Sequence, residues 1–285
     1  MGPTLNIAAV ARRTGVPSDT IRKWEQRYGV LRPERTTGGQ RRYSEEDVAR
    51  VEWLKARLGE GYRIREAAAL LGSAALAAAA SPADLRDALA VAIVRNDHAS
   101  LIVLVQQTLA LNRLEDALTD VIAPVLAAVG EGWETGEISV AQEHLASGVV
   151  RAQLERLLAD ARAAVRGTAV LACAPGERHE LGLLMLAVLL RADGWQVAYL
   201  GADTPVGDAV ALAEENGARL LCFSATLADS GARLHDELDG RALPPGLEIV
   251  LGGRGIEKDV DRDPGVRYVN GDLRRSVRML RKLSL

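Results

Sequence analysis

The 285-residue sequence is long enough for two or three compact units, and with 48% hydrophobic and 26% charged residues it has the composition of a soluble globular protein. No apolar run reaches the ~18 residues of a membrane helix, no signal-peptide pattern is present, and two cysteines are too few for a disulfide framework. We therefore expect a cytoplasmic protein without a membrane partner, in which Cys173 and Cys222 are reduced core residues.

The charge is unevenly distributed along the chain. Residues 1–70 carry 14 Lys+Arg against 9 Asp+Glu, whereas the remainder carries 21 against 29. A basic head on an acidic body indicates that the head meets an anion, with nucleic acid as the first candidate. A chance imbalance of surface charge is the alternative.

The head, residues 1–71, has the layout of a winged helix-turn-helix. A first helix is expected over about 6–13, and Ser18 is expected to cap a second helix that carries several basic residues. Such a second helix enters a major groove, where its basic side chains reach phosphates and base edges. The Gly38-Gly39 turn within "ERTTGGQRRYS" predicts a hairpin wing.

Three segments of the head, "IRKWEQRYGVLRPER", "GGQRRYSEEDV" and "GYRIREAAALL", resemble the DNA-binding domain of MerR-type transcription regulators. The resemblance implies double-stranded operator DNA as a partner. The DNA-binding residues it implies are Arg22, Lys23, Trp24, Arg27, Tyr28, Arg35, Gln40, Arg41, Arg42 and Tyr43. Alternatively, Trp24 and Tyr28 pack in the core and the arginines form a solvated face.

MerR-type regulators usually dimerise through a long coiled-coil helix after this domain. No sustained heptad run follows the head here, and an alanine-rich linker over residues 72–81 is expected instead. Dimerisation or higher assembly must therefore come from the rest of the chain.

Residues 82–166 have the 3.6-residue periodicity of a four-helix bundle. Its expected helices cover roughly 83–95, 98–111, 113–133 and 139–165.

In residues 167–285 short apolar runs alternate with amphipathic segments, which predicts a doubly wound parallel α/β sheet. Its expected strands are 168–174, 195–201, 218–225, 247–253 and 266–270. The fold class is thus multidomain: a winged helix-turn-helix, a helical bundle and an α/β domain. Ligands of such sheets bind beyond the carboxyl ends of the strands, which is where His179 lies.

His179 belongs to the pattern Glu177-x-His179-x-x-Gly182, which resembles the cobalamin-binding signature Asp-x-His-x-x-Gly. A neutral imidazole is a good ligand for cobalt, and a carboxylate two residues away can orient it. Glu177 replaces the usual aspartate, so we expect a longer or indirect contact. The resemblance implies that His179 is the lower axial cobalt ligand and that Gly182 lets the cofactor's nucleotide tail pass close to the next helix.

Later parts of the cobalamin signature also match. "SATL" ends the third expected strand, where these proteins line the tail pocket, and "LGGRG" ends the fourth. The resemblance adds as cofactor-binding residues Ser224, Thr226, Leu227, Gly252 and Gly253. Of the other histidines, His98 is expected to start a bundle helix and His235 to be exposed.

The order of head, bundle and sheet resembles the CarH-type cobalamin-dependent photoreceptors over nearly the whole chain, with Trp133-x9-Glu143-His144 as the matching motif in the bundle. The resemblance implies that Trp133 covers the adenosyl group of adenosylcobalamin. It also implies that Glu143 and His144 hydrogen-bond the ribose and adenine, with Val140 in contact. The alternatives are that these residues merely pack the bundle or cover its surface, and that another cobalamin binds.

One position departs from the CarH pattern. The family has a histidine directly after the tryptophan, which takes the cobalt after photolysis, and this chain has Glu134. Glu134 or water could ligate cobalt, His144 could take over, or the light response is altered or lost. Arg178 and Asp203 match positions of a polar contact between protomers, for which an ion pair within one chain is the alternative.

The resemblance as a whole implies a non-enzymatic repressor that binds adenosylcobalamin in the dark, assembles as a dimer or tetramer on operator DNA, and is released by light. Two other functions stay open. One is a cobalamin-level sensor without a normal light response, and the other is a corrinoid carrier for methyl transfer. Activation instead of repression also stays open.

Overall fold

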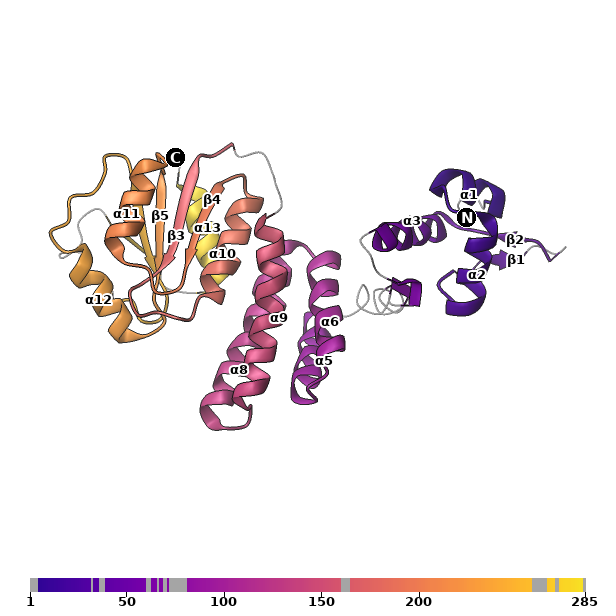
Figure 1. The fold of residues 1–285 in the computed structure, drawn as a ribbon, viewed down its shortest axis with the longest axis horizontal. Coiled ribbons are helices and arrows are strands. Elements are labelled where there is room, and N and C mark those ends of the chain that lie inside the picture. Colours follow the sequence, from indigo (N-terminus) through magenta and orange to yellow (C-terminus); the bar gives the residue numbers. More distant parts are fainter. Residues whose placement is uncertain are drawn as a thin grey trace. The chain divides into compact units, whose positions relative to one another are not determined.

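A computed structural model describes the greater part of the chain (Figure 1). The described residues are 5–31, 33–35, 39–59, 63–65, 67–68, 71, 81–159, 165–257, 266–269 and 272–283. Internal contacts divide the chain into two compact units, Met1–Ser81 and Pro82–Leu285. We had expected a further domain boundary at residues 166/167. The helical part and the sheet together form the second unit, so this boundary stays a prediction.

The first unit contains helix α1 (Ile7–Thr14), helix α2 (Ser18–Tyr28), a short antiparallel hairpin of β1 (Glu34–Arg35) and β2 (Arg41–Arg42), and helix α3 (Glu45–Gly59). The first helix begins one residue later than expected, because Asn6 caps it by accepting a hydrogen bond from the Ala9 amide at 2.8 Å. We expected Ser18 to cap the second helix. It is instead the first residue of α2, and Pro17 holds the cap position.

Five of the eleven residues of the expected last head helix, 61–71, and all but the last residue of the alanine-rich linker lie outside the described residues. The described positions Ile64, Arg65, Ala67, Ala68 and Leu71 are helical. Ala67 and Ala68 are buried in the core of the head together with Val10, Ile21 and Leu54.

The helical part of the second unit contains α5 (Pro82–Val94), α6 (His98–Leu111), α7 (Leu114–Asp116), the π-helix η1 (Ala117–Ile122), α8 (Ala123–Thr135) and α9 (Val140–Ala159). The single helix expected over 113–133 is thus one helical path with a π-helical segment inside it. The expected end of the last helix lies beyond the described residues, since 160–164 are not described. None of the helices among the described residues combines the length and apolarity needed to cross a bilayer.

The sheet has five parallel strands, β3 (Thr168–Cys173), β4 (Gln196–Gly201), β5 (Leu220–Ser224), β6 (Glu248–Gly252) and β7 (Val266–Val269), in the order β4-β3-β5-β6-β7. Helices α10 (Leu181–Ala192), α11 (Val206–Glu215), α12 (Ala228–Leu238) and α13 (Leu273–Lys282) connect or follow the strands. The predicted doubly wound α/β fold is confirmed.

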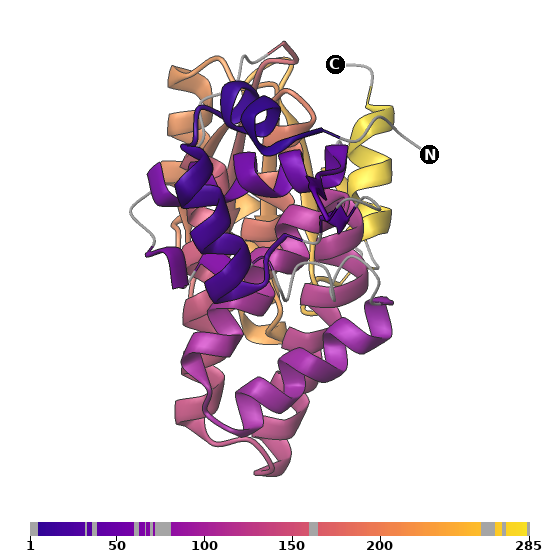
Figure 2. The ribbon, with the colours of Figure 1, turned by 90° about the vertical axis from the view of Figure 1, so that its right-hand side faces the viewer.

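Apolar side chains on both faces of the strands explain why helices cover both sides of the sheet. Val170 and Phe223 face Val206 of α11 and Leu234 of α12, whereas residues such as Leu171 face α10 and α13 on the other side (Figures 1 and 2). The chain reverses its direction of winding between β3 and β5, whose carboxyl ends therefore flank the usual ligand crevice of this architecture.

Polar contacts fix the helical part against the sheet part. Arg274 of α13 donates to Asp116, Thr119 and Asp120 of α7 and η1 at 3.0, 2.6 and 2.8 Å. Arg151 of α9 pairs with Glu180 in the loop before α10. Helices α8 and α9 extend past the carboxyl ends of the strands, so side chains of both parts can meet there (Figure 1).

Candidate functional site

The loop between β3 and α10 holds His179 in a defined orientation. The imidazole Nδ1 lies 2.6 Å from Oε1 of Glu177, and the His179 amide donates to the same oxygen at 2.8 Å. The expectation of a longer or indirect contact is wrong, because the glutamate side chain reaches both groups directly. The His179 side chain is 56% exposed, and its Nε2 has no hydrogen-bond partner among the described residues.

The second carboxylate oxygen of Glu177 binds a different loop. It accepts hydrogen bonds from the amides of Thr226 at 2.6 Å and Leu227 at 2.9 Å, directly after β5. Burial by itself would raise the pKa of Glu177, but the hydrogen bonds from His179, Leu227 and Thr226 outweigh it and hold that pKa below the usual value. An ionised, fully buried carboxylate therefore joins the histidine to the loop after β5.

The loops after β5 and β6 pack backbone against backbone. Gly253 has φ +108°, and a Cβ there would lie 2.1 Å from the Ala225 carbonyl oxygen. The Ala225 amide in turn donates to the Gly252 carbonyl at 3.0 Å, and Ser224 is half-buried at the strand end. Packing within the chain thus already requires the glycine at 253. Gly182, by contrast, is exposed, and no atom lies within 4 Å of a Cβ built there.

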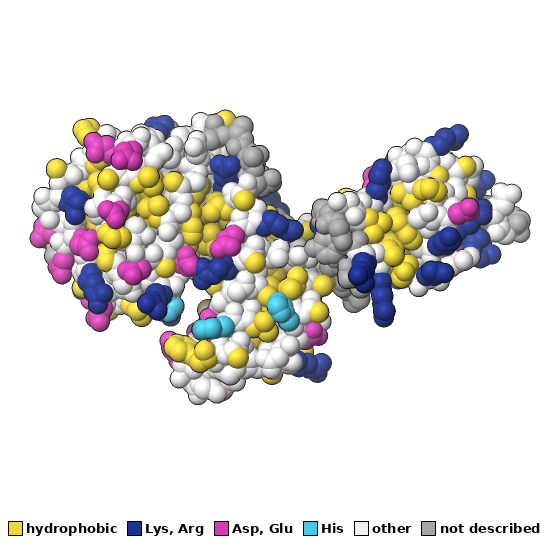
Figure 3. Space-filling view, viewed as in Figure 1, with side chains coloured by type: hydrophobic (Ala, Val, Ile, Leu, Met, Phe, Trp, Pro, Cys, Tyr) yellow, Lys and Arg dark blue, Asp and Glu magenta, His cyan; other side chains and the backbone are white. Residues whose placement is uncertain are grey.

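Apolar side chains are exposed on the helical part and on the loop after β5. Trp133 near the end of α8 is 48% exposed, Val140 at the start of α9 is 54% exposed, and Leu227 is 46% exposed. Large exposed apolar side chains are typical of ligand and interaction surfaces when they gather at one place. Histidine side chains lie on both sides of the hollow between the sheet and the helical part (Figure 3).

Glu143 lies on α9, the helix that also begins with the exposed Val140. It accepts hydrogen bonds from Ser147 and His144, and these outweigh the effect of burial and hold its pKa below the usual value. Further along α9, Arg151 pairs with Glu180, which directly follows His179, so this helix lies against the histidine loop. Glu134 is exposed beside Trp133.

Arg178 and Asp203, the expected protomer contact, are both exposed. Within the described part of the chain no ion pair joins them. Oδ1 of Asp203 accepts a hydrogen bond from the Gly176 amide at 2.7 Å, inside the histidine loop.

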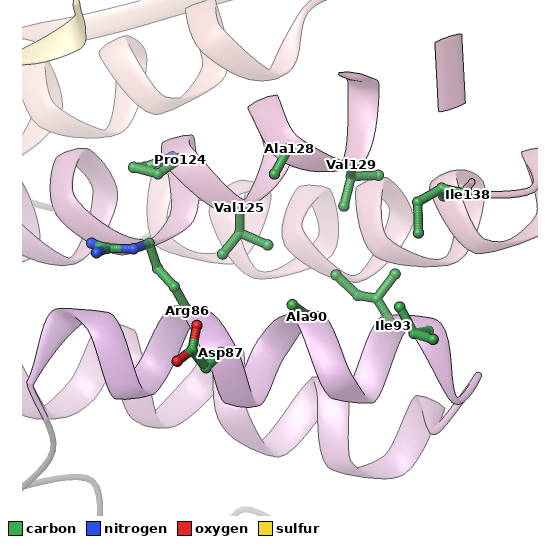
Figure 4. Close-up of a pocket in the computed structure, with 10 residues that line it drawn as sticks. Arg86, Asp87, Ala90, Ile93, Pro124, Val125, Ala128, Val129 and Ile138 are labelled. Atoms are coloured by element: carbon green, nitrogen blue, oxygen red, sulfur yellow. The ribbon is translucent and has the colours of Figure 1, made fainter. Parts of the chain in front are cut away.

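A cavity of about 320 Å³ lies between α5 and α8, away from the strands (Figure 4). Its wall is apolar except for Arg86 and Asp87 on α5. Nη1 of Arg86 donates to the Asp120 carbonyl of η1 at 2.7 Å. Sequence reasoning had not indicated this cavity, because no motif marks it.

The head presents basic side chains on α2 and the hairpin (Figure 3). The exposed members of the expected DNA-binding set are Arg22, Lys23, Arg27, Arg35 and Gln40, whereas Tyr28, Arg41 and Arg42 are half-buried. Nε of Arg41 donates to Glu25 at 2.8 Å, which ties the hairpin to α2. This arrangement holds the helix and the hairpin in a fixed relation on one surface.

The structure corrects three expectations: Trp24 and Tyr43 as DNA contacts, and His235 as an exposed residue. Tyr43 is completely buried, and its hydroxyl donates to Glu25 at 2.9 Å; Trp24 is only 7% exposed. Both therefore belong to the core of the head. His235 is only 5% exposed, because it stacks on Tyr268 and bonds the Glu257 carbonyl at 3.0 Å.

The two cysteines are buried, and burial raises the pKa of each thiol to about 12. They are unreactive core groups, in agreement with their position in apolar strands.

Comparison with known families finds a match for three regions of the chain. Residues 5–74 match the MerR HTH family regulatory proteins, and residues 85–158 and 167–275 each match a B12 binding domain. The HTH-type transcriptional repressor CarH of Myxococcus xanthus is 37% identical over 265 residues, which are 88% of this chain and 89% of that protein. The chain belongs to the CarH family.

A second member of the CarH family, the HTH-type transcriptional repressor CarA of Myxococcus xanthus, is 34% identical over 90% of this chain and 88% of its own length. Among solved structures, a Methanosarcina barkeri monomethylamine corrinoid protein covers 70% of this chain and 98% of its own, with a TM-score of 0.52 at 22% identity, and supports the fold alone. The chain thus combines, as a member of the CarH family, a MerR HTH region with two B12 binding domain regions.

The described side chains fit a corrinoid. His179 offers one imidazole nitrogen, backed by a buried carboxylate, at the ligand end of the sheet. Trp133 and Val140 offer uncovered apolar surface on the adjoining helices. The neutral imidazole would serve as a cobalt ligand, and the corrinoid would bring the other ligands of its metal.

Proposed function

We propose that this repressor binds adenosylcobalamin, assembles on operator DNA in the dark, and leaves the DNA after light breaks the cobalt–carbon bond. The single observation that carries the proposal is the ion pair between Arg151 of α9, the helix that carries Glu143 and His144, and Glu180 directly after His179. It brings the Trp133-x9-Glu143-His144 motif of the helices to the same region as the histidine loop of the sheet. The family membership supports the repressor and B12-binding parts of the proposal.

In this proposal each group of residues has one task. His179 would ligate the cobalt through Nε2, and Glu177 would hold the ring through Nδ1. The loops that contain Ser224, Thr226, Leu227, Gly252 and Gly253, together with Gly182, surround the nucleotide tail. Trp133 and Val140 cover the adenosyl group, and Glu143 and His144 bind its polar atoms.

When bound, the cofactor would supply a photolabile bond between cobalt and its adenosyl group. In the dark, the contact between Trp133 and the adenosyl group would hold α8 and α9 over that group. Loss of this contact would allow the two helices to move. Several heads held together by an oligomer, a dimer or tetramer, gain avidity for a repeated operator. Arg178 is proposed to join protomers through its exposed guanidinium.

A spectroscopic titration tests the cofactor part. Apo-protein is titrated with adenosylcobalamin in darkness and the absorbance spectrum is recorded for wild type, His179→Ala and, as a control, His98→Ala. We expect the spectrum of imidazole-ligated cobalt for wild type and His98→Ala, and its loss in His179→Ala. Identical spectra for all three proteins would contradict the assignment of His179.

Glu134 favours a second candidate, a cobalamin-level sensor without a normal light response. A carboxylate is a harder ligand than imidazole and is a poorer replacement on cobalt. Comparing the oligomeric state of adenosylcobalamin-loaded wild type and Glu134→His before and after illumination decides between them. Light-driven dissociation that occurs only in Glu134→His would favour the level sensor, and light-driven dissociation of wild type would favour the photoreceptor.

A further inference from the structure

Asp203, in the turn between β4 and α11, has a backbone conformation that side-chain-bearing residues rarely adopt. Its φ is +49°, and among the described residues Asn96 is the one other non-glycine residue with positive φ. Aspartate and asparagine tolerate this left-handed region better than most residues. Left-handed backbone at a non-glycine residue often accompanies a functional constraint.

Two hydrogen bonds of Asp203 bracket the segment before His179. Its carboxylate Oδ1 accepts from the Gly176 amide at 2.7 Å, and its own amide donates to the Glu177 carbonyl at 2.9 Å. The first bond needs an acceptor side chain at position 203, whereas the second is a backbone bond. Together they fix the backbone on both sides of the Gly176–Glu177 peptide.

The neighbouring residues extend the same connection. The Thr204 amide donates to the Cys173 carbonyl at 3.3 Å, and the Thr204 hydroxyl donates to the Gly201 carbonyl at 3.3 Å. The turn after β4 is therefore joined to the end of β3 and to the loop that follows it. Thr204 is buried, whereas Asp203 is exposed at the outer end of this connection.

We infer that Asp203 is a positioning residue for the cobalt ligand, acting through the backbone of Gly176 and Glu177 on the orientation of His179. The inference rests on the proposed cobalamin function and goes beyond the contact between protomers that the family resemblance implies. The hydrogen bonds of Asp203 hold the backbone of Glu177 in place, and the Glu177 carboxylate in turn holds the imidazole of His179. Loss of the Asp203 acceptor therefore loosens the ligand without removing it.

Three variants of Asp203 distinguish the effect of its hydrogen-bond acceptor from the effects of its charge and of its backbone conformation. Asp203→Asn keeps Oδ1 and the tolerance for positive φ but removes the charge. Asp203→Ala removes both the acceptor and the charge, and Asp203→Gly removes them while relieving the backbone. Asp208→Ala, on the exposed first turn of α11, is the matched control.

We expect Asp203→Ala and Asp203→Gly to bind adenosylcobalamin about tenfold more weakly, as after loss of an outer partner of a metal ligand. Part of their bound cofactor has the spectrum of water-ligated cobalt, whereas Asp203→Asn and Asp208→Ala match wild type. Asp203→Gly keeps the test decisive if Asp203→Ala does not fold. Wild-type affinity and spectrum in Asp203→Gly, or an equal loss in Asp203→Asn, would overturn the inference.

Hydrogen exchange of the apo-protein separates this inference from the proposed function. The Gly176 amide is expected to exchange slowly in wild type and Asp203→Asn, and faster in Asp203→Gly. This result does not depend on cobalamin. Failure of wild type to bind any cobalamin would contradict the proposed function, whereas unchanged Gly176 exchange in Asp203→Gly would contradict the role of Asp203.

Discussion

Oε2 of Glu177 lies 2.6 Å from the amide nitrogen of Thr226, 49 residues further along the chain. The same carboxylate holds the imidazole of His179 through its other oxygen. One buried charge thus couples the loop after β3 to the loop after β5. A movement of the His179 ring would therefore also move the loop of Thr226 and Leu227, which we propose to surround the nucleotide tail.

Glu177→Gln is expected to weaken both loops. An amide can accept hydrogen bonds through one atom only, so either the His179 groups or the Thr226 and Leu227 amides lose their acceptor. A buried donor without a partner costs about 1–3 kcal/mol, and we expect a loss of that size in the unfolding free energy of the apo-protein. Urea denaturation measures it, with Glu214→Gln on the exposed face of α11 as the control. Equal stability of the two variants would contradict the coupling.

Gly182→Ala and Gly253→Ala are expected to behave in opposite ways. Alanine at 253 meets the Ala225 carbonyl and requires positive φ, which lowers apo-protein stability by at least ~1–3 kcal/mol. Alanine at 182 meets nothing and favours the helix by up to ~1 kcal/mol. If the cofactor tail passes Gly182, this variant loses cobalamin affinity while its melting temperature is unchanged or higher. Full affinity would place the tail elsewhere.

Arg274→Ala is expected to loosen α7 and η1 from the sheet. The guanidinium donates to Asp116, Thr119 and Asp120 and is about one-third exposed, so solvent screening limits the loss to ~1–2 kcal/mol. Arg275→Ala, one residue away and exposed, is the control. Thermal unfolding at low and high salt measures the difference. The effect of Arg274→Ala should shrink in high salt, and a salt-independent difference would contradict an electrostatic origin.

In the head, Lys23→Ala is expected to weaken DNA binding with little dependence on sequence. A lysine that contacts phosphate contributes about one released counterion, so the slope of log affinity against log salt falls by ~1. Arg113→Ala, on an exposed arginine of the second unit, is the control. Fluorescence anisotropy with duplex DNA at several salt concentrations measures the slopes, and parallel lines for wild type and Lys23→Ala would contradict the contact.

Much of the fold was predictable because its elements have clear local patterns. The alternation of apolar runs and helices placed all five strands within two residues, since buried parallel strands are apolar throughout. The position of His179 beyond β3 followed from the same pattern. The π-helical segment at Ala117–Ile122 could not be predicted, because its residues have the same apolar spacing as an ordinary helix.

Errors in the candidate sites came from tertiary contacts that no local pattern reveals. Tyr43 lies among arginines in the sequence, yet the isolated bridge to Leu5 and the bond to Glu25 draw it into the core. His235 lies in a polar segment, yet the buried face of α12 carries it against Tyr268. The role of Asp203 within its own protomer was hidden in the same way, because Gly176 is 27 residues away.

The most direct measurement is size-exclusion chromatography with full absorbance spectra on protein loaded with adenosylcobalamin, first in darkness and then after green light. We predict a dark oligomer whose spectrum changes on illumination and which dissociates at the same time. A spectral change without dissociation would contradict the claim that light controls assembly and would favour a sensor of cobalamin level.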